Sequence, residues 1–189
     1  MKQVNSSFFE DHPVDCAKRL IGAELHWDEC SGLIVETEAY TEKADPACHT
    51  FFRPSARAFV ERESAGTAYV YLNYGVHWLF NILVKGTDGI GFVLLRALEP
   101  KEGIDQIRER RQGRCDRELC SGPGRLTQAL GIDGEIHGEK FLCSKDRGIR
   151  LGSEVECLTG SRIGISRGQD LPWRFGMPGS RHLSKPFPK

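Results

Sequence analysis

The first hundred residues carry the apolar patterns of β-strands. Aromatic and aliphatic side chains alternate through residues 67–75, which is typical of a half-buried strand, and residues 91–97 are apolar almost throughout. Turn-forming residues at 28–32 predict an antiparallel hairpin between the strands on either side, and residues 86–89 form a second turn. We expect strands at residues 21–27, 33–40, 67–75, 76–85 and 91–97.

Helical patterns are shorter and lie mostly between strands. Pro13 suits the first turn of a helix that Gly22 ends, and Ile104 and Ile107 give a later helix its apolar face. We expect helices at residues 7–23, 101–113 and 125–130.

The remaining segments carry weaker signals. Residues 41–66 contain two prolines and little periodicity, so we expect an ordered loop with at most a short helix at 56–63. A loop of that length inside a compact domain more often has a function than not. The tail from about residue 176 is rich in Pro and Gly and is expected to be irregular. Late in the chain we expect short strands at residues 140–143, 154–158 and 162–165.

The order of these elements predicts the fold class. Strands gather early and late with helices between them, which favours an α+β fold over alternating βαβ units. We expect one domain over residues 1–189, with a mixed, mostly antiparallel sheet, a protruding tyrosine-bearing β-hairpin and surrounding helices. A chain of 189 residues is long enough to bury one hydrophobic core and is short for two domains.

Charge is balanced overall but unevenly distributed. Residues 1–50 carry four basic and ten acidic side chains, a net charge of −6, whereas residues 161–189 carry six basic and one acidic, a net charge of +5. A further basic run lies at residues 108–114. Two interpretations stay open: a basic face that contacts nucleic-acid phosphates, or a solvated basic helix and tail.

Cysteine usage and hydropathy exclude several classes of protein. The seven cysteines are scattered and include no C-x-x-C pair, so we expect reduced thiols, no disulfide framework and no zinc or other metal site. Apolar runs are too short for a membrane span, and the first residues lack the apolar core of a signal peptide. We therefore expect a cytoplasmic protein without a membrane partner or a cofactor, associated with the nucleoid if the source is bacterial.

Candidate chemistry begins in the strand at 33–40. Side chains two positions apart share one face of a strand, so Glu36, Glu38 and Tyr40 are expected to point the same way. Such a strand either runs out into solvent or delivers a carboxylate and an aromatic ring into a pocket. Taken alone, the solvated strand end is the better interpretation.

Further polar and aromatic residues favour the pocket. The residues concerned are His49, Tyr71, Tyr74, Asn81 and Arg96. Flat rings, an amide, a carboxylate and a guanidinium together suit a planar substrate that forms hydrogen bonds, because rings stack on a base and an amide reads its edge. The alternative, that the tyrosines only fill the core of a sheet, is common in strands of this kind.

Five motifs, in order and in register, resemble the 3-methyladenine (alkyladenine) DNA glycosylase family of base-excision repair. The resemblance extends from about Phe8 to Phe175. Residues 50–62 depart from the family pattern by being shorter, and the tail after residue 176 by lacking the usual aromatic residue. The motifs are Ile34–Tyr40 with Asp45–His49, Tyr69–Asn81, Leu94–Pro100, Ser121–Leu130 and Arg162–Ile165.

The resemblance implies a monofunctional glycosylase that flips a damaged purine out of duplex DNA and hydrolyses its N-glycosidic bond. Glu38 matches the general base, Arg96 matches a residue that places the attacking water, and the backbone carbonyl of Ile163 would contact that water too. The resemblance implies no family role for Glu36, and no lysine is placed for a lyase reaction.

The remaining matches concern the base and the DNA. Tyr40 and His49 match one wall of the base pocket and Tyr71 the other, while Asn81 matches the side chain that crowds the amino group of normal guanine. Tyr74 matches the wedge that fills the gap left in the base stack. The expected partner is duplex DNA containing an alkylated or deaminated purine, and the protein is expected to act as a monomer.

Two other functions stay open at this point. A homologue that recognises lesions without cutting would bind lesion DNA in a salt-sensitive manner and release no base. A nucleoside or glycoside hydrolase using Glu36 and Glu38 is a weaker alternative, because two carboxylates on one strand face are too close and too parallel to flank a sugar.

Overall fold

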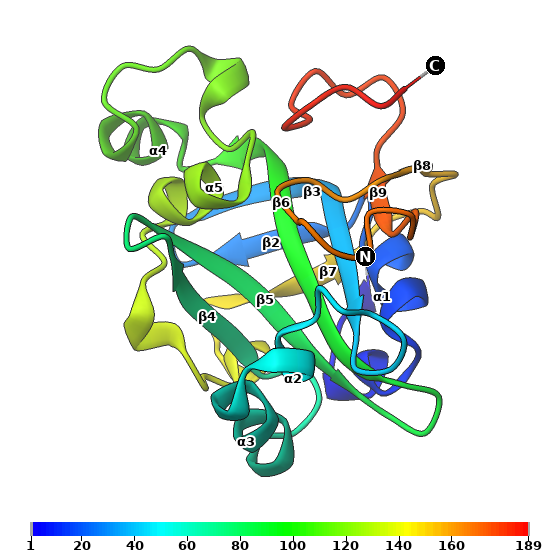
Figure 1. Cartoon of the computed structure of the whole chain (residues 1–189). Coiled ribbons are helices and arrows are strands. Elements are labelled where there is room, and N and C mark those ends of the chain that lie inside the picture. Colours follow the sequence, from blue (N-terminus) through cyan, green and yellow to red (C-terminus); the bar gives the residue numbers. More distant parts are fainter. Residues whose placement is uncertain (1, 189) are drawn as a thin grey trace.

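A nine-stranded sheet with helices around it makes up the chain, according to a computed structural model that describes residues 2–188 (Figure 1). The strands are β1 (Lys2–Gln3), β2 (Glu24–Trp27), β3 (Cys30–Thr41), β4 (Ala68–Asn73), β5 (His77–Lys85), β6 (Ile90–Glu102), β7 (Arg147–Leu151), β8 (Leu158–Gly160) and β9 (Arg174–Gly176). The helices are α1 (Pro13–Arg19), α2 (His49–Phe52), α3 (Pro54–Arg62), α4 (Ile104–Arg110) and α5 (Pro123–Leu130), with 3₁₀ turns at Ser6–Glu10, Asp116–Glu118, Gly134–Ile136 and Phe141–Cys143.

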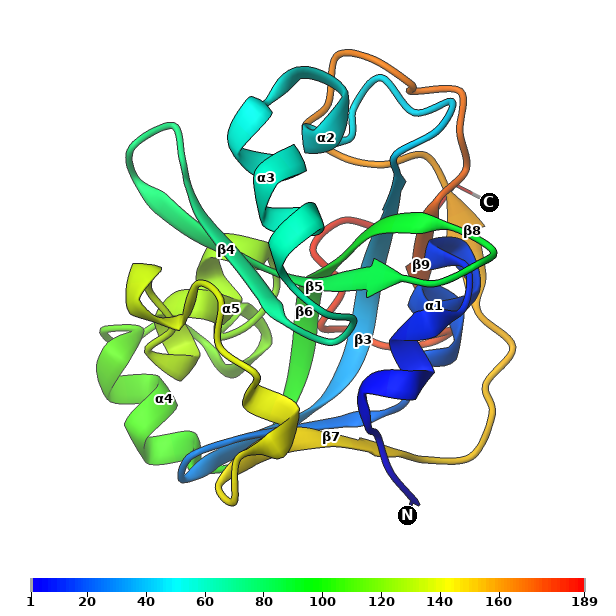
Figure 2. The same ribbon diagram turned by 90° about the horizontal axis from the view of Figure 1, so that it is seen from below.

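The sheet is antiparallel in every pairing that the structure describes. Its order is β1-β7-β2-β3-β6-β5-β4, and β9 and β8 continue it beside β3. Helices α4 and α5 lie at one end of the central strands, α2 and α3 at the other, and α1 packs beside β3 (Figures 1 and 2). The expected α+β class with a mostly antiparallel sheet is confirmed.

Strand β3 is the central element because it changes neighbours halfway along. Its first residues pair with β2, and residues 36–38 pair with β9, while β6 accompanies it along its length. Register shifts at Glu36 mark the change. A bulge at such a point increases local twist and changes the direction of side chains. Here the affected half of β3 is the one that carries Glu38 and Tyr40.

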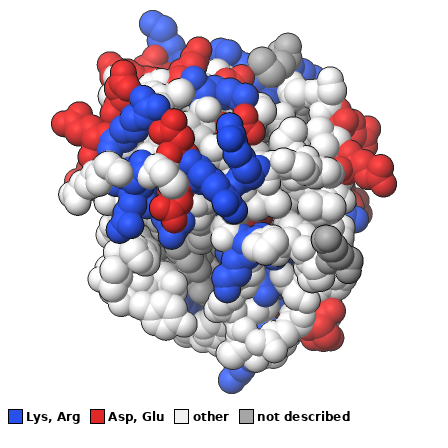
Figure 3. Space-filling model, turned by 90° about the horizontal axis from the view of Figure 1, so that it is seen from above, with Lys and Arg blue, Asp and Glu red and all other residues white. Residues whose placement is uncertain are grey.

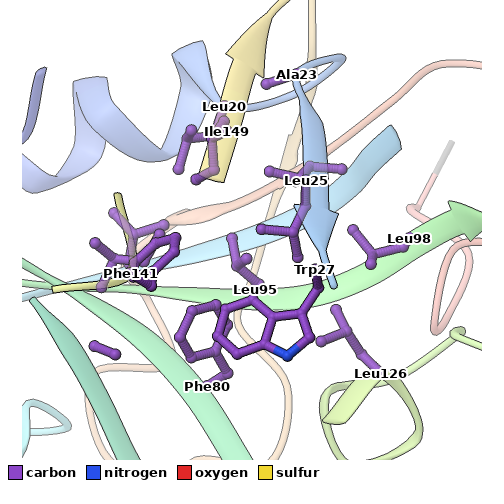
Figure 4. Close-up of a cluster of buried hydrophobic side chains, with 14 of the residues drawn as sticks. Leu20, Ala23, Leu25, Trp27, Phe80, Leu95, Leu98, Leu126, Phe141 and Ile149 are labelled. Carbon is purple, nitrogen blue, oxygen red and sulfur yellow. The ribbon is translucent and has the colours of Figure 1, made fainter. Parts of the chain in front are cut away.

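The main core contains buried side chains of the central strands, of β7 and of the 3₁₀ turns. Trp27 lies edge-on to Phe80 with ring centroids 5.3 Å apart, and Phe141 lies within 5.7 Å of both (Figure 4). A second buried cluster contains Phe59 of α3, Tyr69 of β4, Phe92 of β6 and their neighbours. Tyr69 stacks on Phe92 at 4.4 Å, so this second cluster supports the strands that carry the tyrosines.

The late strands were predicted in the wrong places. Residues 140–143 form a 3₁₀ turn, residues 154–157 are irregular, and residues 162–165 form no strand; the strands in this region are β7, β8 and β9. These strands are three to five residues long and lack a clear alternation of apolar positions, so their partners define them. In residues 162–165 the buried ion pair of Arg162 and the positive φ of Gly164 replace an extended ladder.

Two other boundaries differ from expectation. Residues 49–62 form α2 and α3, so the expected loop is largely helical, with Pro54 opening α3. Strand β6 continues to Glu102 because it stays paired with β3, and this shortens the expected helix at 101–113 to Ile104–Arg110. The tail beyond Gly176 carries no helix or strand up to residue 188, as expected. Within residues 2–188, no helix has the length and apolar character needed to cross a bilayer.

Candidate active site

A cavity of about 990 Å³ opens between the β4–β5 hairpin, the start of α2, the start of α5 and the loop after β8. Its walls bring together residues that are far apart in the sequence. Seven of the eight predicted site residues line it: Tyr40, His49, Tyr71, Tyr74, Asn81, Arg96 and Ile163. The eighth, Glu38, lies directly behind three of them.

The Glu38 carboxylate has no exposed surface and is held by three groups. The backbone N–H of Ile163 donates to its Oε1 at 2.7 Å, and the Tyr40 hydroxyl donates to its Oε2 at 2.7 Å. Arg96 Nη1 lies 3.1 Å from the same Oε2. Ile163 was expected to contribute its carbonyl to a water molecule; in this structure its amide contacts the carboxylate itself.

Acceptor capacity distinguishes Glu38 from its neighbour Glu36. A carboxylate has about four acceptor positions. Glu36 receives four donors: Arg96 Nε, Arg174 Nε and Ser184 Oγ contact its Oε1, and the Ser184 amide donates to its Oε2. Glu38 receives three, and its Oε1 accepts only from the Ile163 amide, which leaves one position there for a water molecule. All three groups around Glu38 line the cavity, whereas of the groups around Glu36 only Arg96 does, and this speaks against a pair of catalytic carboxylates.

The pKa values of the two carboxylates are shifted in opposite directions. Burial raises the pKa of Glu38, and the opposing effects of Arg96, the Ile163 amide and the Tyr40 hydroxyl do not fully offset it. For Glu36 burial acts in the same direction, but Arg96, Arg174 and Ser184 outweigh it and lower the pKa. A raised pKa is what a group needs in order to accept a proton from water in a buried site.

The aromatic wall of the cavity is a set of rings in mutual contact. His49 lies 4.4 Å from Tyr71 between ring centroids, and its Nδ1 lies 2.9 Å from the Tyr69 hydroxyl. Burial and the nearby Arg53 lower the pKa of His49 to about 4, so the imidazole is neutral at neutral pH. The Arg53 guanidinium lies 5.3 Å from the Tyr71 ring. The wall therefore offers uncharged, electron-rich surfaces to a flat ligand.

Asn81 lies on the floor of the cavity, on β5 beside β4. Its amide nitrogen donates to the carbonyls of Tyr69 at 3.2 Å and of Leu79 at 3.5 Å, and the side chain lines the cavity. The side chain is buried and its orientation is held by the backbone of the neighbouring strand.

Tyr74 stands at the tip of the β4–β5 hairpin. Tyr74 and Gly75 both have positive φ, and the Val76 amide donates to the Asn73 carbonyl, which describes a type I′ turn. A tyrosine in this conformation is uncommon and is strained relative to glycine. Its ring is 88% exposed at the rim of the cavity, so it is placed to contact something outside the molecule.

Comparison with known proteins agrees with this geometry. A sequence model described as methylpurine-DNA glycosylase matches residues 7–181. The chain belongs to this family. Relatives named provisionally as 3-methyladenine DNA glycosylases include one from Bradyrhizobium diazoefficiens, 43% identical over all of this chain and 94% of its own length. A second, from Agrobacterium fabrum, is 45% identical over 98% and 94% respectively.

Membership of the methylpurine-DNA glycosylase family makes the chain a DNA glycosylase for alkylated bases, and DNA its substrate. The basic residues around the cavity fit such a substrate. Arg111, Arg114, Arg125 and Arg167 line it; Arg111 is buried and the other three are exposed. Seen from the side of α4, α5 and the tail, Lys and Arg side chains gather around a hollow in the surface (Figure 3). Of the basic run at 108–114, only Arg111 and Arg114 reach the cavity, whereas Arg108 pairs with Asp105 and Asp116.

One functional element of this glycosylase was missed in the sequence. Arg162 and Asp45 form a fully buried bidentate ion pair, with N–O distances of 2.6 and 2.7 Å. The Arg162 guanidinium also donates to the carbonyl of Ala39 and lies 4.6 Å from the Tyr40 ring. The pair joins the loop after β3 to the loop that carries Ile163, and both loops lie together near α2 (Figure 2). Asp45 and Arg162 both lie in motifs that resemble the family, and this was the one signal in the sequence that could have singled them out.

Metal ligands were not expected in the site. Among residues 2–188, no group of three or more His, Cys, Asp or Glu side chains is arranged to hold a metal ion. The cavity is lined instead by rings, amides and guanidinium groups.

Proposed function

We propose that this family member is a monofunctional glycosylase that flips an alkylated or deaminated purine out of duplex DNA and hydrolyses its N-glycosidic bond with water activated by Glu38. The observation that carries the proposal is the state of Glu38: buried, held from three sides, and with one acceptor position left beside an aromatic cavity. The protein acts as a monomer in this proposal.

The chemistry needs a carboxylate at this place. When the base departs, positive charge develops on the sugar, and a nearby carboxylate stabilises that charge while it accepts a proton from the attacking water. Arg96 keeps Glu38 oriented through the contact at 3.1 Å. In this proposal the flipped nucleotide brings its sugar over Tyr40, Arg96 and Ile163, the cavity-lining groups that surround Glu38.

The rings select the base. Alkylation makes a purine cationic, and a cationic ring stacks well on electron-rich aromatic faces. We assign Tyr40 and His49 to one side of the flipped base and Tyr71 to the other, and the main chain of His49 to the base edge. Asn81, held by the Tyr69 carbonyl, would crowd the amino group of a normal guanine.

Exposed residues around the cavity are assigned to contacts with the DNA. Flipping a nucleotide costs a few kcal/mol, and the cost is lower for a lesion that pairs poorly. The exposed ring of Tyr74 offsets part of this cost by filling the vacated space in the stack. The three exposed arginines that line the cavity, Arg114, Arg125 and Arg167, would neutralise phosphates on either side of the lesion.

Water, rather than an amine of the protein, is the proposed nucleophile. Because no lysine lines the cavity in the described residues, strand cleavage through a Schiff base is not part of the proposal.

The test is release of 3-methyladenine or hypoxanthine from a duplex with a single lesion, under single-turnover conditions. We expect Glu38→Gln to lower the rate by about 10²- to 10⁴-fold, the range of general-base catalysis, while lesion binding persists. Glu154→Gln, a change of the same kind at an exposed position, should keep the full rate. Equal rates for wild type and Glu38→Gln would contradict the mechanism.

A wild type that binds the lesion duplex tightly and in a salt-sensitive manner, but releases no base at any protein concentration, would instead show the alternative function, recognition without cleavage.

A further inference from the structure

The C-terminal tail reaches into the buried charge cluster behind the site. Ser184 lies three residues beyond the region that the family match covers. Its backbone amide donates to Glu36 Oε2 at 2.6 Å, and its hydroxyl donates to Glu36 Oε1 at 2.7 Å. The same hydroxyl accepts from Arg96 Nη2 at 3.3 Å. A serine hydroxyl has one hydrogen to donate and can accept, so this one links Glu36 to Arg96 with both functions in use.

Arg96 distributes its guanidinium over three partners. Its Nε contacts Glu36 at 2.9 Å, its Nη1 contacts Glu38 at 3.1 Å and its Nη2 donates to Ser184. A planar guanidinium with three fixed directions cannot rotate without breaking these contacts. The contact to Glu38 is therefore held in place by the two others, one of which belongs to the tail.

The tail itself is anchored at several points. Arg174 of β9 donates to the carbonyl of Lys185, and its guanidinium lies 3.9 Å from the Phe187 ring. Arg174 Nε also contacts Glu36 at 2.9 Å. With Glu36 and Glu38 facing Arg96 and Arg174, the buried cluster carries balanced charge, and the tail completes its polar contacts.

We propose that Ser184 is a positioning residue for the glycosylase reaction, in that its hydroxyl fixes Arg96 and Glu36 and thereby holds Arg96 against Glu38. This inference rests on the proposed function of Glu38. It gives the C-terminal tail a role in catalysis although the tail does not line the base pocket and touches Glu38 only through Arg96.

The expected consequence follows from the loosened guanidinium. In Ser184→Ala, Arg96 Nη2 loses its acceptor and Glu36 loses one donor, so Arg96 is held less firmly against Glu38. Misplacement on the scale of 1 Å can slow a reaction by as much as 100-fold, and we expect single-turnover base release to slow by about 10- to 100-fold. Lesion affinity should change little because the aromatic wall of the cavity, including Tyr40, His49 and Tyr71, is untouched.

A pH profile distinguishes positioning from simple stabilisation. The titratable or charged groups that face Glu38 are Glu36 and Tyr40 on β3, Arg96 on β6, Tyr71 on β4 and Arg162 after β8. Arg96 lowers the pKa of Glu38. With Arg96 loosened, that pKa rises, so the acid limb of the rate profile should move to higher pH by roughly one unit.

The experiment compares four proteins: wild type, Ser184→Ala, Ser184→Thr and Ser180→Ala. Ser184→Thr keeps the hydroxyl and should restore the rate and the profile. Ser180→Ala removes a hydroxyl that accepts from the His182 amide in the same tail, and should leave both unchanged. Rates are measured below the unfolding temperature of each protein. An unchanged rate and profile in Ser184→Ala, with at most a lower Tm, would overturn the proposal.

A second readout does not depend on activity. Titration of the Glu38 carboxyl by ¹³C NMR, in glutamate-labelled protein, should show a higher pKa in Ser184→Ala than in wild type and Ser184→Thr. If wild type releases no base, the proposed function fails, and this titration still decides the proposal: a shift supports positioning and identical titrations refute it. If Ser184→Ala does not fold, a Ser184→Thr protein with wild-type rate, profile and titration supports it, and one with a shifted profile and titration refutes it.

Discussion

The buried ion pair between Asp45 and Arg162 offers a sharp test of what holds the site together. Asp45→Asn keeps the shape of the side chain and removes its charge. Both side chains are fully buried, and the carboxylate also accepts from the amides of Thr41 and Ala47. Asparagine has one oxygen, so its NH₂ group must face Arg162 or a backbone N–H, and the guanidinium loses its counterion.

The loss of stability in Asp45→Asn follows from the burial of the ion pair. Removing one partner of a buried ion pair typically costs about 3–5 kcal/mol, because the other charge remains without compensation. For a chain of 189 residues, each kcal/mol lowers Tm by about 2–4 °C. We therefore expect Asp45→Asn to lower Tm by roughly 6–20 °C. Base release below Tm should also slow, because Arg162 precedes Ile163, whose amide holds Glu38.

A second pair with the same chemistry provides the control. Asp28 and Arg147 form a bidentate pair with N–O distances of 2.7 and 3.1 Å, but their side chains are 47% and 23% exposed. Exposed pairs are worth about 1 kcal/mol or less, and asparagine tolerates the positive φ of residue 28. Thermal unfolding followed by circular dichroism compares the two variants. If Asp45→Asn lowers Tm no more than Asp28→Asn, the reasoning from burial is wrong.

Three further predictions concern the rim, the imidazole and a strand contact. Tyr74→Ala should leave Tm unchanged and weaken binding to a lesion duplex by about tenfold or more, as lost base stacking implies; Tyr74→Phe should bind normally. Folding depresses the pKa of His49 from about 6.5 to about 4, so its contribution to stability is present above pH 6.5 and lost as pH falls toward 4; in urea unfolding, the difference in unfolding free energy between wild type and His49→Gln should change with pH only within that window. Gly91→Ala places a Cβ 1.9 Å from the Tyr40 carbonyl oxygen and should cost about 1–3 kcal/mol or more, whereas Gly148→Ala has room and should fold normally.

The strands in the first hundred residues were the part of the fold that the sequence predicted well. The alternation in residues 67–75 lies in β4 and the apolar run of 91–97 in β6. Both strands bury side chains against the core, and such strands carry a readable apolar pattern. The late strands β7, β8 and β9 escaped prediction because strands of three to five residues carry too few positions for a pattern and depend on their partners.

Motif residues were predictable as a set, but their contacts were not. Seven of the eight line one cavity, and Glu38 lies behind it. No pattern in the sequence indicated that Arg162 pairs with Asp45, 117 positions away, or that Ser184 contacts Glu36, 148 positions away. Polar contacts over such separations have no periodicity, so sequence spacing carries no signal for them.

By itself the sequence determined the family, the α+β class and the residue types around the base pocket, because these depend on motifs and local patterns. It left Glu36 and Glu38 as near-equivalent carboxylates on one strand face. Only the tertiary structure separated them, since the difference lies in how many donors the fold brings to each: four to Glu36 and three to Glu38. A protonation state and a free acceptor position are set by neighbours in space, and those neighbours come from β6, β9, the loop after β8 and the tail.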